Sequence, residues 1–235
     1  LKIDDFSKRF ISPAVATVAN KIDHAGLALY KTVYNSVGVP ATVPSALLTY
    51  LKAGVKLDEN AAPMDGQRSI CITPMMQATI VDALKGLFQQ SAAIASQYRR
   101  GQMGTAIGLD WFMDQNCNTH TVGPQGGTPL VNGSTSSGAT TLVTDGWTSS
   151  AASRLKEGDI FTIAGVNSVN PQSRQSTGSK QQFVVTADVS SDGSGNLTAA
   201  ISPAITSSGA FQTVDALPAD NAALAIIGAA SAQSP

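Results

Sequence analysis

The sequence predicts an α+β protein in which a helical body carries a small module of antiparallel strands, either a barrel or a sandwich. Apolar residues recur at helical spacing in the first half, whereas the second half is rich in Ser, Thr and Gly and alternates short apolar runs with turns. The clearest run extends from Leu155 to Val166, where a charged turn centred on Gly158 leads into β-branched and aromatic residues. Gly158 can adopt positive φ, and these residue types favour a pleated surface, so the run predicts a buried strand after a tight turn.

A long helix is predicted near the start of the chain. Ser12 can cap it, and Pro13 suits the first helical position because its missing N–H would be unpaired there. The pattern ends near residues 35–38, which gives a helix of about 22 residues and about 33 Å, long enough for a structural spine. Phe6 and Phe10 are assigned to a separate short helix or an incoming arm. The predicted apolar face comprises Ala14, Val18, Ile22, Ala25, Leu29 and Val33.

Four further elements are expected before residue 123. A second helix starts at Pro44-Ser45 and is closed by Gly54, because Gly is the commonest residue at a helix C-terminus. A short strand over 68–73 follows, stopped by Pro74, and its Cys71 is predicted to be a buried thiol. Helical spacing resumes from Met76 to Phe88, and residues 106–113 are expected to form a strand.

Residues 124–129 (Pro-Gln-Gly-Gly-Thr-Pro) mark a boundary by composition. Several short strands with Gly-, Asn-, Asp- and Ser-rich turns then suggest a small barrel or sandwich rather than βαβ units. The predicted strands are 140–144, 160–164, 182–187, 197–201 and 211–214.

Composition narrows the functional classes. Hydrophobic residues make up 43% of the chain, which is ample for a core, but only 13% are charged and the net charge is −1. This balance gives no electrostatic reason to expect nucleic-acid or anionic-membrane binding as the main activity. A surface poor in charge suits either a protein covered by neighbouring subunits or a secreted β-rich protein.

The sequence gives little support to three kinds of chemical site. The spacing Gly101-x-x-Gly104-x-x-x-Gly108 could cradle phosphate, but it follows a helix and precedes a strand, which is the reverse of a dinucleotide-binding loop. Asp114, Cys117 and His120 could surround a metal, yet a structural zinc site takes four ligands and a solvated loop fits better. No Gly-x-Ser-x-Gly elbow occurs, and only two histidines are available for a catalytic triad. We therefore predict no catalytic residue, no metal and no cofactor.

Some polar and aromatic residues suggest binding. Arg99 and Arg100, beside Tyr98, could contact phosphate or pair with acids of a neighbouring subunit. Trp147 could be a stacking platform for a sugar, although it is more simply an anchor at the end of a strand. The sequons at Asn132 and Asn196 are interpreted as turn residues.

Several motifs resemble the coat protein family of short-tailed bacteriophages. In that family a Tyr-Arg-x-Gly-x-x-Gly turn precedes a Gly-Phe-Asp strand and a His-Thr pair. Here the matching segments are 98–104 (Tyr-Arg-Arg-Gly-Gln-Met-Gly), 107–110 (Ile-Gly-Leu-Asp) and 119–121 (Thr-His-Thr), with Leu109 in place of the usual Phe. The run 63–74 (Pro-Met-Asp-Gly-Gln-Arg-Ser-Ile-Cys-Ile-Thr-Pro) occupies the expected place after the spine-like helix, and the Leu155–Val166 run resembles the opening of an inserted β-barrel.

The resemblance implies the tailed-phage (Hong-Kong-97-type) capsid fold with an insertion domain. It implies an incomplete capsid core over 1–123, the inserted barrel over 124–206 and a return into the core over 207–235, so that the chain would be the middle of a longer coat protein. It further implies a major capsid subunit, not an enzyme, which self-assembles as hexamers and pentamers of an icosahedral shell. The shell would enclose double-stranded DNA, contacted non-specifically at most, with help from a scaffolding protein and a portal and without a membrane. The location would be the virion, after synthesis in the host cytoplasm.

Within this hypothesis, four charged residues are expected at subunit interfaces: Arg99, Arg100, Glu157 and Asp159. The alternative is a carbohydrate- or receptor-binding tail or surface adhesin, in which the β-rich half carries the site.

Overall fold

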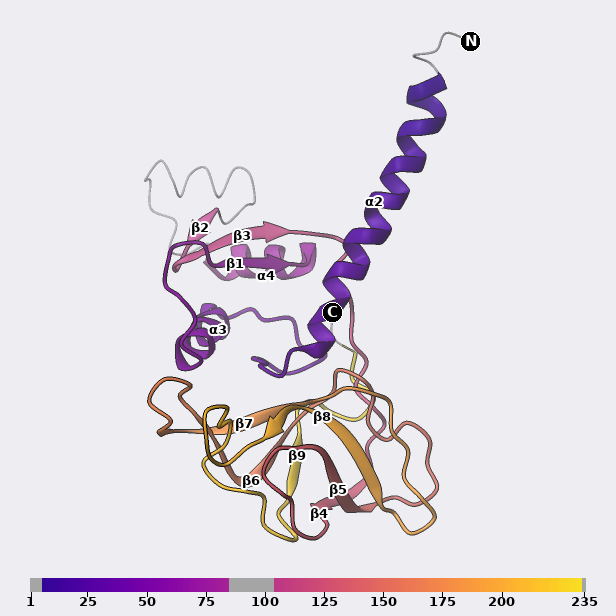
Figure 1. The fold of residues 1–235 in the computed structure, drawn as a ribbon. Coiled ribbons are helices and arrows are strands. Elements are labelled where there is room, and N and C mark those ends of the chain that lie inside the picture. Colours follow the sequence, from indigo (N-terminus) through magenta and orange to yellow (C-terminus); the bar gives the residue numbers. More distant parts are fainter. Residues whose placement is uncertain (1–5, 85–103, 234–235) are drawn as a thin grey trace.

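The computed structural model describes residues 6–84 and 104–233 and confirms the α+β prediction (Figure 1). Helices and a small sheet occupy the first half of the chain, and a six-stranded antiparallel barrel occupies the second. The described helices are η1 (Ser7–Ile11, a π-helical turn), α2 (Ser12–Leu27), η2 (Ala28–Thr32, 3₁₀), α3 (Leu47–Glu59) and α4 (Pro74–Leu84). The strands are β1 (Ser69–Ile72), β2 (Thr105–Ala106), β3 (Leu109–Met113), β4 (Gly127–Val131), β5 (Ala139–Trp147), β6 (Ile160–Val169), β7 (Ser176–Val185), β8 (Leu197–Ile205) and β9 (Leu224–Ile226).

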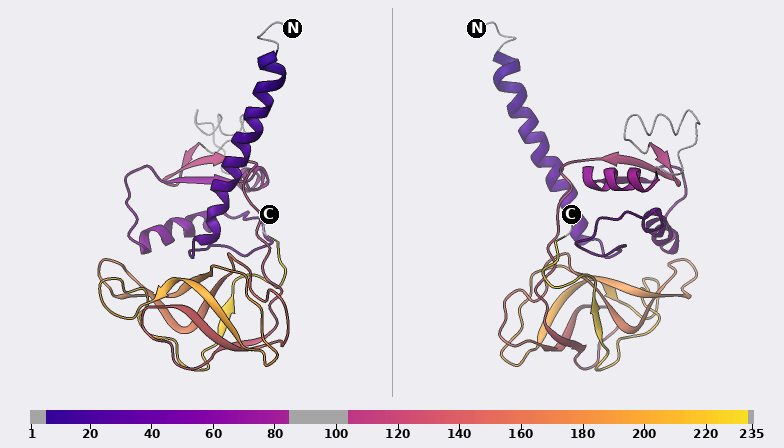
Figure 2. Two further views of the ribbon diagram at one scale, coloured as in Figure 1. Left: turned by 45° about the vertical axis from the view of Figure 1, so that its right-hand side comes forward. Right: turned by 180° about the vertical axis from the view of Figure 1, so that it is seen from behind.

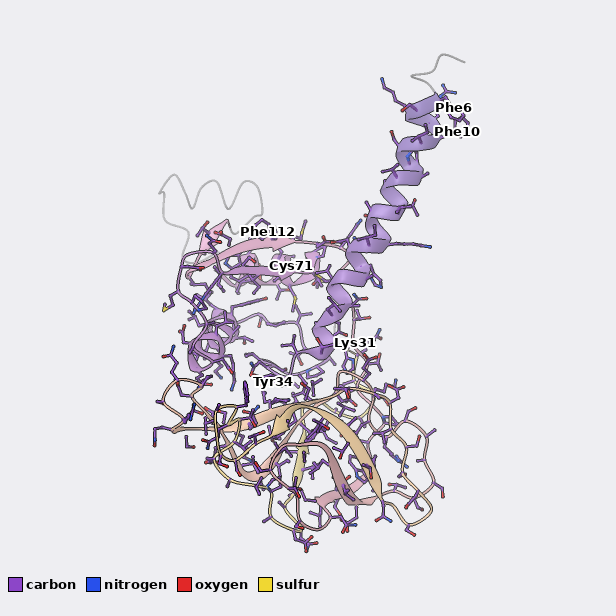
Figure 3. All side chains as sticks on the ribbon, in the orientation of Figure 1. Phe6, Phe10, Lys31, Tyr34, Cys71 and Phe112 are labelled. Carbon is purple, nitrogen blue, oxygen red and sulfur yellow. The ribbon has the colours of Figure 1, made fainter. Side chains whose placement is uncertain are left out.

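The predicted long helix is present, but it starts earlier than expected. It also ends at Thr32, before the predicted end at residues 35–38, because Val33 is already extended (φ −93°, ψ 122°). Residues 7–32 are helical without a break, so Ser12 has helical dihedrals (φ −58°, ψ −45°) and does not cap the helix. Phe6 and Phe10 therefore belong to this helical segment rather than to a separate arm, and their rings lie 5.2 Å apart. Figures 1 and 2 show α2 projecting past the small sheet and away from the barrel, with Phe6 and Phe10 at its far end (Figure 3).

A small second core lies between α3, α4 and a three-stranded sheet of order β1-β3-β2. Strands β1 and β3 are parallel, whereas β2 and β3 form a hairpin. Tyr50 of α3, Ile72 of β1 and Ile80 of α4 are buried against one another. The prediction that Gly54 closes α3 is wrong: the helix continues to Glu59, and the amide of Asn60 caps it by donating to the Lys56 carbonyl (2.8 Å). Pro74 does end β1 as expected, and α4 begins there.

The barrel has strand order β4-β5-β8-β7-β6-β9, and all its neighbouring pairs are antiparallel. Backbone bonds between Val131 and the 221–222 turn (2.9 Å each) bring the β9 segment back to β4, so the barrel is nearly closed. Four of the five predicted strands are present. Residues 211–214 form no strand, and β4 and β9 were not predicted.

The Leu155–Val166 run enters the barrel as predicted. Gly158 has φ +93°, and Phe161, Ile163 and Val166 are each at most 1% exposed. The inward face skips one position between Ile163 and Val166, because the β6–β7 register shifts there and Gly165 has φ +78°. Phe161 stacks on Phe183 of β7 with ring centroids 5.7 Å apart, which places this strand pair at the centre of the core.

The predicted division has the chain leave the barrel after residue 206. In the structure, the segment that follows still belongs to the barrel. Val214 is buried in the barrel core, and β9 pairs with β6. The chain then returns beside the start of the barrel: the Val122 N–H donates to the Ala232 carbonyl (2.9 Å), and Thr121 bridges Gln233. The two ends of the barrel are therefore neighbours, although the domain boundaries themselves stay a prediction.

Candidate functional site

The helical segment formed by α2 and η2 exposes one apolar face. Val15, Val18, Ile22 and Leu29, here called the α2 stripe, follow the helical spacing of a buried face, yet each is 58–69% exposed. No residue of the 7–32 segment is buried by the described parts of the chain. A surface helix normally stabilises itself by packing such a face, so the stripe has the pattern of a contact surface without a partner in the described chain.

The charged turn at residues 155–159 is split between interior and surface. Asp159, one of the residues expected at a subunit interface, is only 2% exposed within the chain. Its carboxylate accepts hydrogen bonds from His120 Nε2 (2.8 Å), the Gly123 N–H (3.0 Å) and the Lys156 N–H (2.8 Å). These bonds tie the first barrel turn to the segment that leads into the barrel. An interface role for Asp159 stays a prediction.

Glu157, in contrast, is exposed. Its N–H donates to Asp188 Oδ1 (2.8 Å), and its carboxylate interacts electrostatically with the hydroxyl of Tyr30 in η2. Burial, and then the negative charge of Glu157, raise the pKa of the Tyr30 hydroxyl. Glu157 thus lies where the end of the long helical segment meets the barrel, and its predicted role at a subunit interface remains a prediction.

A polar seam joins the helical half to the barrel. Ser36 and the side chain of Gln182 in β7 form two hydrogen bonds, of 2.9 and 3.0 Å. The Ser179 hydroxyl donates to Glu59 of α3 (3.1 Å). Beside this seam the ring of Tyr30 packs edge-on against His120, with centroids 6.3 Å apart. A cavity of about 380 Å³ lies here, lined by Tyr30, Val33, Asn35, Ser36, Val37, Pro40, His120, Val122, Gly158, Asp159, Ile160 and Ile227.

The three candidate metal ligands have different partners. Asp114 accepts from the Asn116 N–H (2.7 Å), His120 pairs with Asp159, and the Cys117 sulfur lies 3.6 Å from Cys71. Within the two described ranges, no group of three or more His, Cys, Asp or Glu side chains is arranged to hold a metal ion. The prediction of a buried Cys71 is wrong, because this residue of β1 is exposed.

The glycine spacing and Trp147 also have structural roles. Gly104 and Gly108 have φ +60° and +75°, and Gly108 forms the tight turn between β2 and β3, as a turn interpretation requires. Arg99 and Arg100 lie outside the described residues, as does Gly101. Trp147 is 4% exposed and its indole N–H donates to the Thr144 hydroxyl (2.8 Å), so it anchors the end of β5 and offers no face to a sugar. None of the described helices is both long and apolar enough to cross a membrane.

Sequence reasoning missed two features of this region. The Cys71–Cys117 contact joins residues 46 positions apart, and it depends on the parallel β1–β3 pairing, for which the sequence carries no local signal. The His120–Asp159 pair spans 39 positions and depends on how the barrel closes on its own starting segment. The His120-Thr121 pair can be recognised in the sequence, but nothing near it indicates that Asp159 is the partner of His120.

Comparison with known proteins identifies the family. The family model described as P22 coat protein, gene protein 5, matches residues 52–234. Among solved structures, the CUS-3 coat protein I-domain is similar, with 28% sequence identity over 42% of this chain and 94% of that one and a TM-score of 0.30. No curated protein matches the chain. Because the family model spans well over half of the sequence, the chain belongs to the P22 coat protein family and is a structural coat protein of a bacteriophage.

Proposed function

We propose that this chain acts as a major capsid subunit that self-assembles into an icosahedral shell around the double-stranded DNA of a short-tailed phage. The α2 stripe carries this proposal. Fully burying a Val, Leu or Ile side chain is favourable by about 1.5–3 kcal/mol, so four such residues left exposed on one helix face represent a large unused contribution to association. Contacts with neighbouring subunits or with other parts of the capsid core would bury these side chains and gain this free energy.

The arrangement of the barrel supports the same proposal. The segments that flank it are hydrogen-bonded to each other, from the Val122 N–H to the Ala232 carbonyl, so the barrel can be carried by a host domain through two adjacent connections. This is the geometry that an insertion domain of a Hong-Kong-97-type capsid fold requires. In that arrangement α2 would be the spine helix, and the barrel would contribute to folding and to contacts between subunits.

Assembly into a shell implies further partners and a location for this subunit. Subunits would form hexamers and pentamers, assisted by a scaffolding protein and a portal, and would contact the enclosed DNA non-specifically at most. Such a subunit is made in the host cytoplasm, ends in the virion, and needs neither a catalytic site nor a cofactor.

The test compares two aspartate substitutions on adjacent residues of α2. Val18→Asp places a charge on the α2 stripe, whereas Thr17→Asp places the same charge on another exposed face of the helix. Both are introduced into the coat protein expressed with its scaffold, and particles are quantified by sedimentation and electron microscopy. We expect Val18→Asp to abolish shells or reduce them at least tenfold, and Thr17→Asp to assemble close to the unsubstituted level.

Folding of both variants is measured by circular dichroism and thermal melting. Val18 is 58% exposed within the described chain, so replacing it should not unfold the protein. The melting temperature of Val18→Asp should therefore match that of Thr17→Asp. Equal shell yields for the two variants would contradict the role of the stripe, and a protein that stays monomeric under all assembly conditions would contradict the shell itself.

A further inference from the structure

The two cysteines of the chain are brought together by the small sheet. Cys71 lies in β1, opposite Phe112 of the parallel strand β3, and Cys117 lies in the loop that follows β3. Their sulfur atoms are 3.6 Å apart, in hydrogen-bonding contact. Figure 3 labels Cys71 and Phe112 next to each other on the small sheet.

Both thiols are free, and neither takes part in a metal cluster within residues 6–84 and 104–233. A disulfide brings its two sulfur atoms to about 2.0 Å, so closure needs an approach of roughly 1.5 Å. Rotation about the Cα–Cβ bonds and a small shift of the loop can supply such a movement, since Cys117 lies outside the regular elements.

We propose that Cys71 and Cys117 form a redox-responsive dithiol site that reacts with small disulfides and closes to an intrachain disulfide. The thiolate of Cys71 attacks one sulfur of an oxidant such as oxidised glutathione, forming a mixed disulfide and releasing one thiolate. The Cys117 thiol then loses its proton to solvent and attacks the Cys71 sulfur, which breaks the mixed disulfide and releases the second small thiol. The two protein thiols are oxidised, and one small disulfide is reduced to two thiols.

The exposure of the two residues sets this order of attack. Cys71 is exposed, so a solution oxidant can reach its sulfur, whereas Cys117 is partly buried. Burial, and then the hydrogen bond with Cys71, raise the pKa of Cys117 to about 12, so this thiol stays protonated at neutral pH and is the slower nucleophile. Cys117 is therefore the resolving thiol, which acts only once the first disulfide lies beside it.

Closure would fix the loop that contacts α2. Asn116 donates to Asp23 of α2 (2.7 Å), and Asn118 donates to the His24 carbonyl (2.9 Å). Cys117 lies between these two contacts in sequence. A bond from Cys117 to β1 would therefore tie the loop beneath α2 to the small sheet, in a state that a reducing solution opens again. This inference concerns the folded chain alone and does not depend on shell assembly.

The experiment incubates the intact folded chain with oxidised glutathione, blocks remaining thiols by alkylation, and maps peptides by mass spectrometry without reduction. We expect a monomer that has lost two hydrogens, with Cys71 joined to Cys117, and a thermal midpoint that rises and returns when dithiothreitol is added. Cys117→Ser should instead retain glutathione on Cys71, and Cys71→Ser should react much more slowly; neither should show the dithiothreitol-sensitive shift.

Three results would overturn the inference. These are disulfides between chains in place of the internal one, an internal bond that forms only in denaturant, and a stable glutathione adduct on Cys71 when Cys117 is present. The two serine variants differ from the native residue by one atom at partly or fully exposed positions, and their far-ultraviolet circular dichroism before oxidation shows whether they have folded.

Discussion

Replacing Asp159 tests whether the buried carboxylate, rather than the apolar core alone, holds the start of the barrel together. Asp159→Ala removes the acceptor of the Gly123 and Lys156 N–H groups and the partner of His120. Asp159→Asn keeps one oxygen that both N–H groups can reach, and its amide can donate to His120 Nε2 in the other imidazole tautomer. The two substitutions therefore separate the loss of the acceptor from the loss of the charge.

The magnitudes follow from the burial of the site. Each buried donor left without a partner costs about 1–3 kcal/mol. Asp159→Ala leaves the N–H groups of Gly123 and Lys156 without their acceptor, so it should lower the free energy of unfolding by about 2–6 kcal/mol. Asp159→Asn loses only the charge assistance of its hydrogen bonds and should cost about 1–2 kcal/mol. Glu157→Gln, at the exposed neighbour two positions away, should stay within about 0.5 kcal/mol and is the matched control.

Equilibrium unfolding in urea at pH 7 measures these values. Trp147 reports on the barrel because it is buried in the barrel core, and a Trp111→Phe background removes the second indole of the chain. If Asp159→Ala unfolds at the same urea concentration as Glu157→Gln, the carboxylate does not stabilise the turn. If Asp159→Asn costs as much as Asp159→Ala, charge rather than hydrogen-bond geometry is the cause, and the reasoning fails at that step.

Two further predictions concern the barrel. Burial opposes ionisation of Asp215, but hydrogen bonds led by the Asn167 side chain lower its pKa below the ordinary value of 3.8. The stability that this carboxylate contributes is complete above the ordinary pKa and is lost as pH falls through the lowered one, so Asp215→Asn should flatten the decline of barrel stability between about pH 5 and pH 2. An unchanged acid slope in urea titrations would exclude this role. Gly127→Ala should destabilise the barrel by more than Gly133→Ala: both residues have positive φ (+87° and +78°), but an added Cβ at Gly127 would collide with the Gly146 carbonyl, whereas Gly133 faces open space. The conformational part is about 1–2 kcal/mol in each, and thermal melting of the two variants should differ by the clash alone; equal melting temperatures would show that the β4–β5 pair can separate without cost.

Local pattern was sufficient for most of the elements. The helical spacing from Ala14 to Val33 predicted the helical segment of α2 and η2, although Val33 itself lies beyond its end, and the alternation after Gly158 predicted the inward face of β6. These predictions succeed because helix and strand periodicity depend on neighbours within a few residues. The failures at Gly54 and at residues 211–214 have different causes. A glycine inside a helix costs only about 1 kcal/mol, so α3 continues through Gly54 to Glu59. Val214, in contrast, is buried in the barrel core without belonging to a strand.

Contacts between distant segments could not be predicted in this way. Nothing near Asp159 in sequence indicates that its carboxylate would be buried beneath His120, and nothing near Cys71 indicates a thiol 46 positions away. Short β4 and β9 were missed because each gains its strand conformation from the edge of a barrel that other strands build. A strand of three residues such as β9 has too little pattern of its own to be recognised.

By itself, the sequence determined the α+β class, the long apolar-faced helix, the strands of the β-rich half and, through motif order, the resemblance to phage coat proteins that the family match supports. Only the tertiary structure decided that the β-rich half is a nearly closed barrel rather than a sandwich, that the segments flanking it meet at residues 122 and 232, and that Asp159 is buried while Glu157 is exposed. The physical reason is that periodicity shows which face of an element is apolar, whereas the partner of that face depends on the path of the whole chain. The α2 stripe shows the same division: its pattern is fully written in the sequence, and the described structure leaves it without a partner.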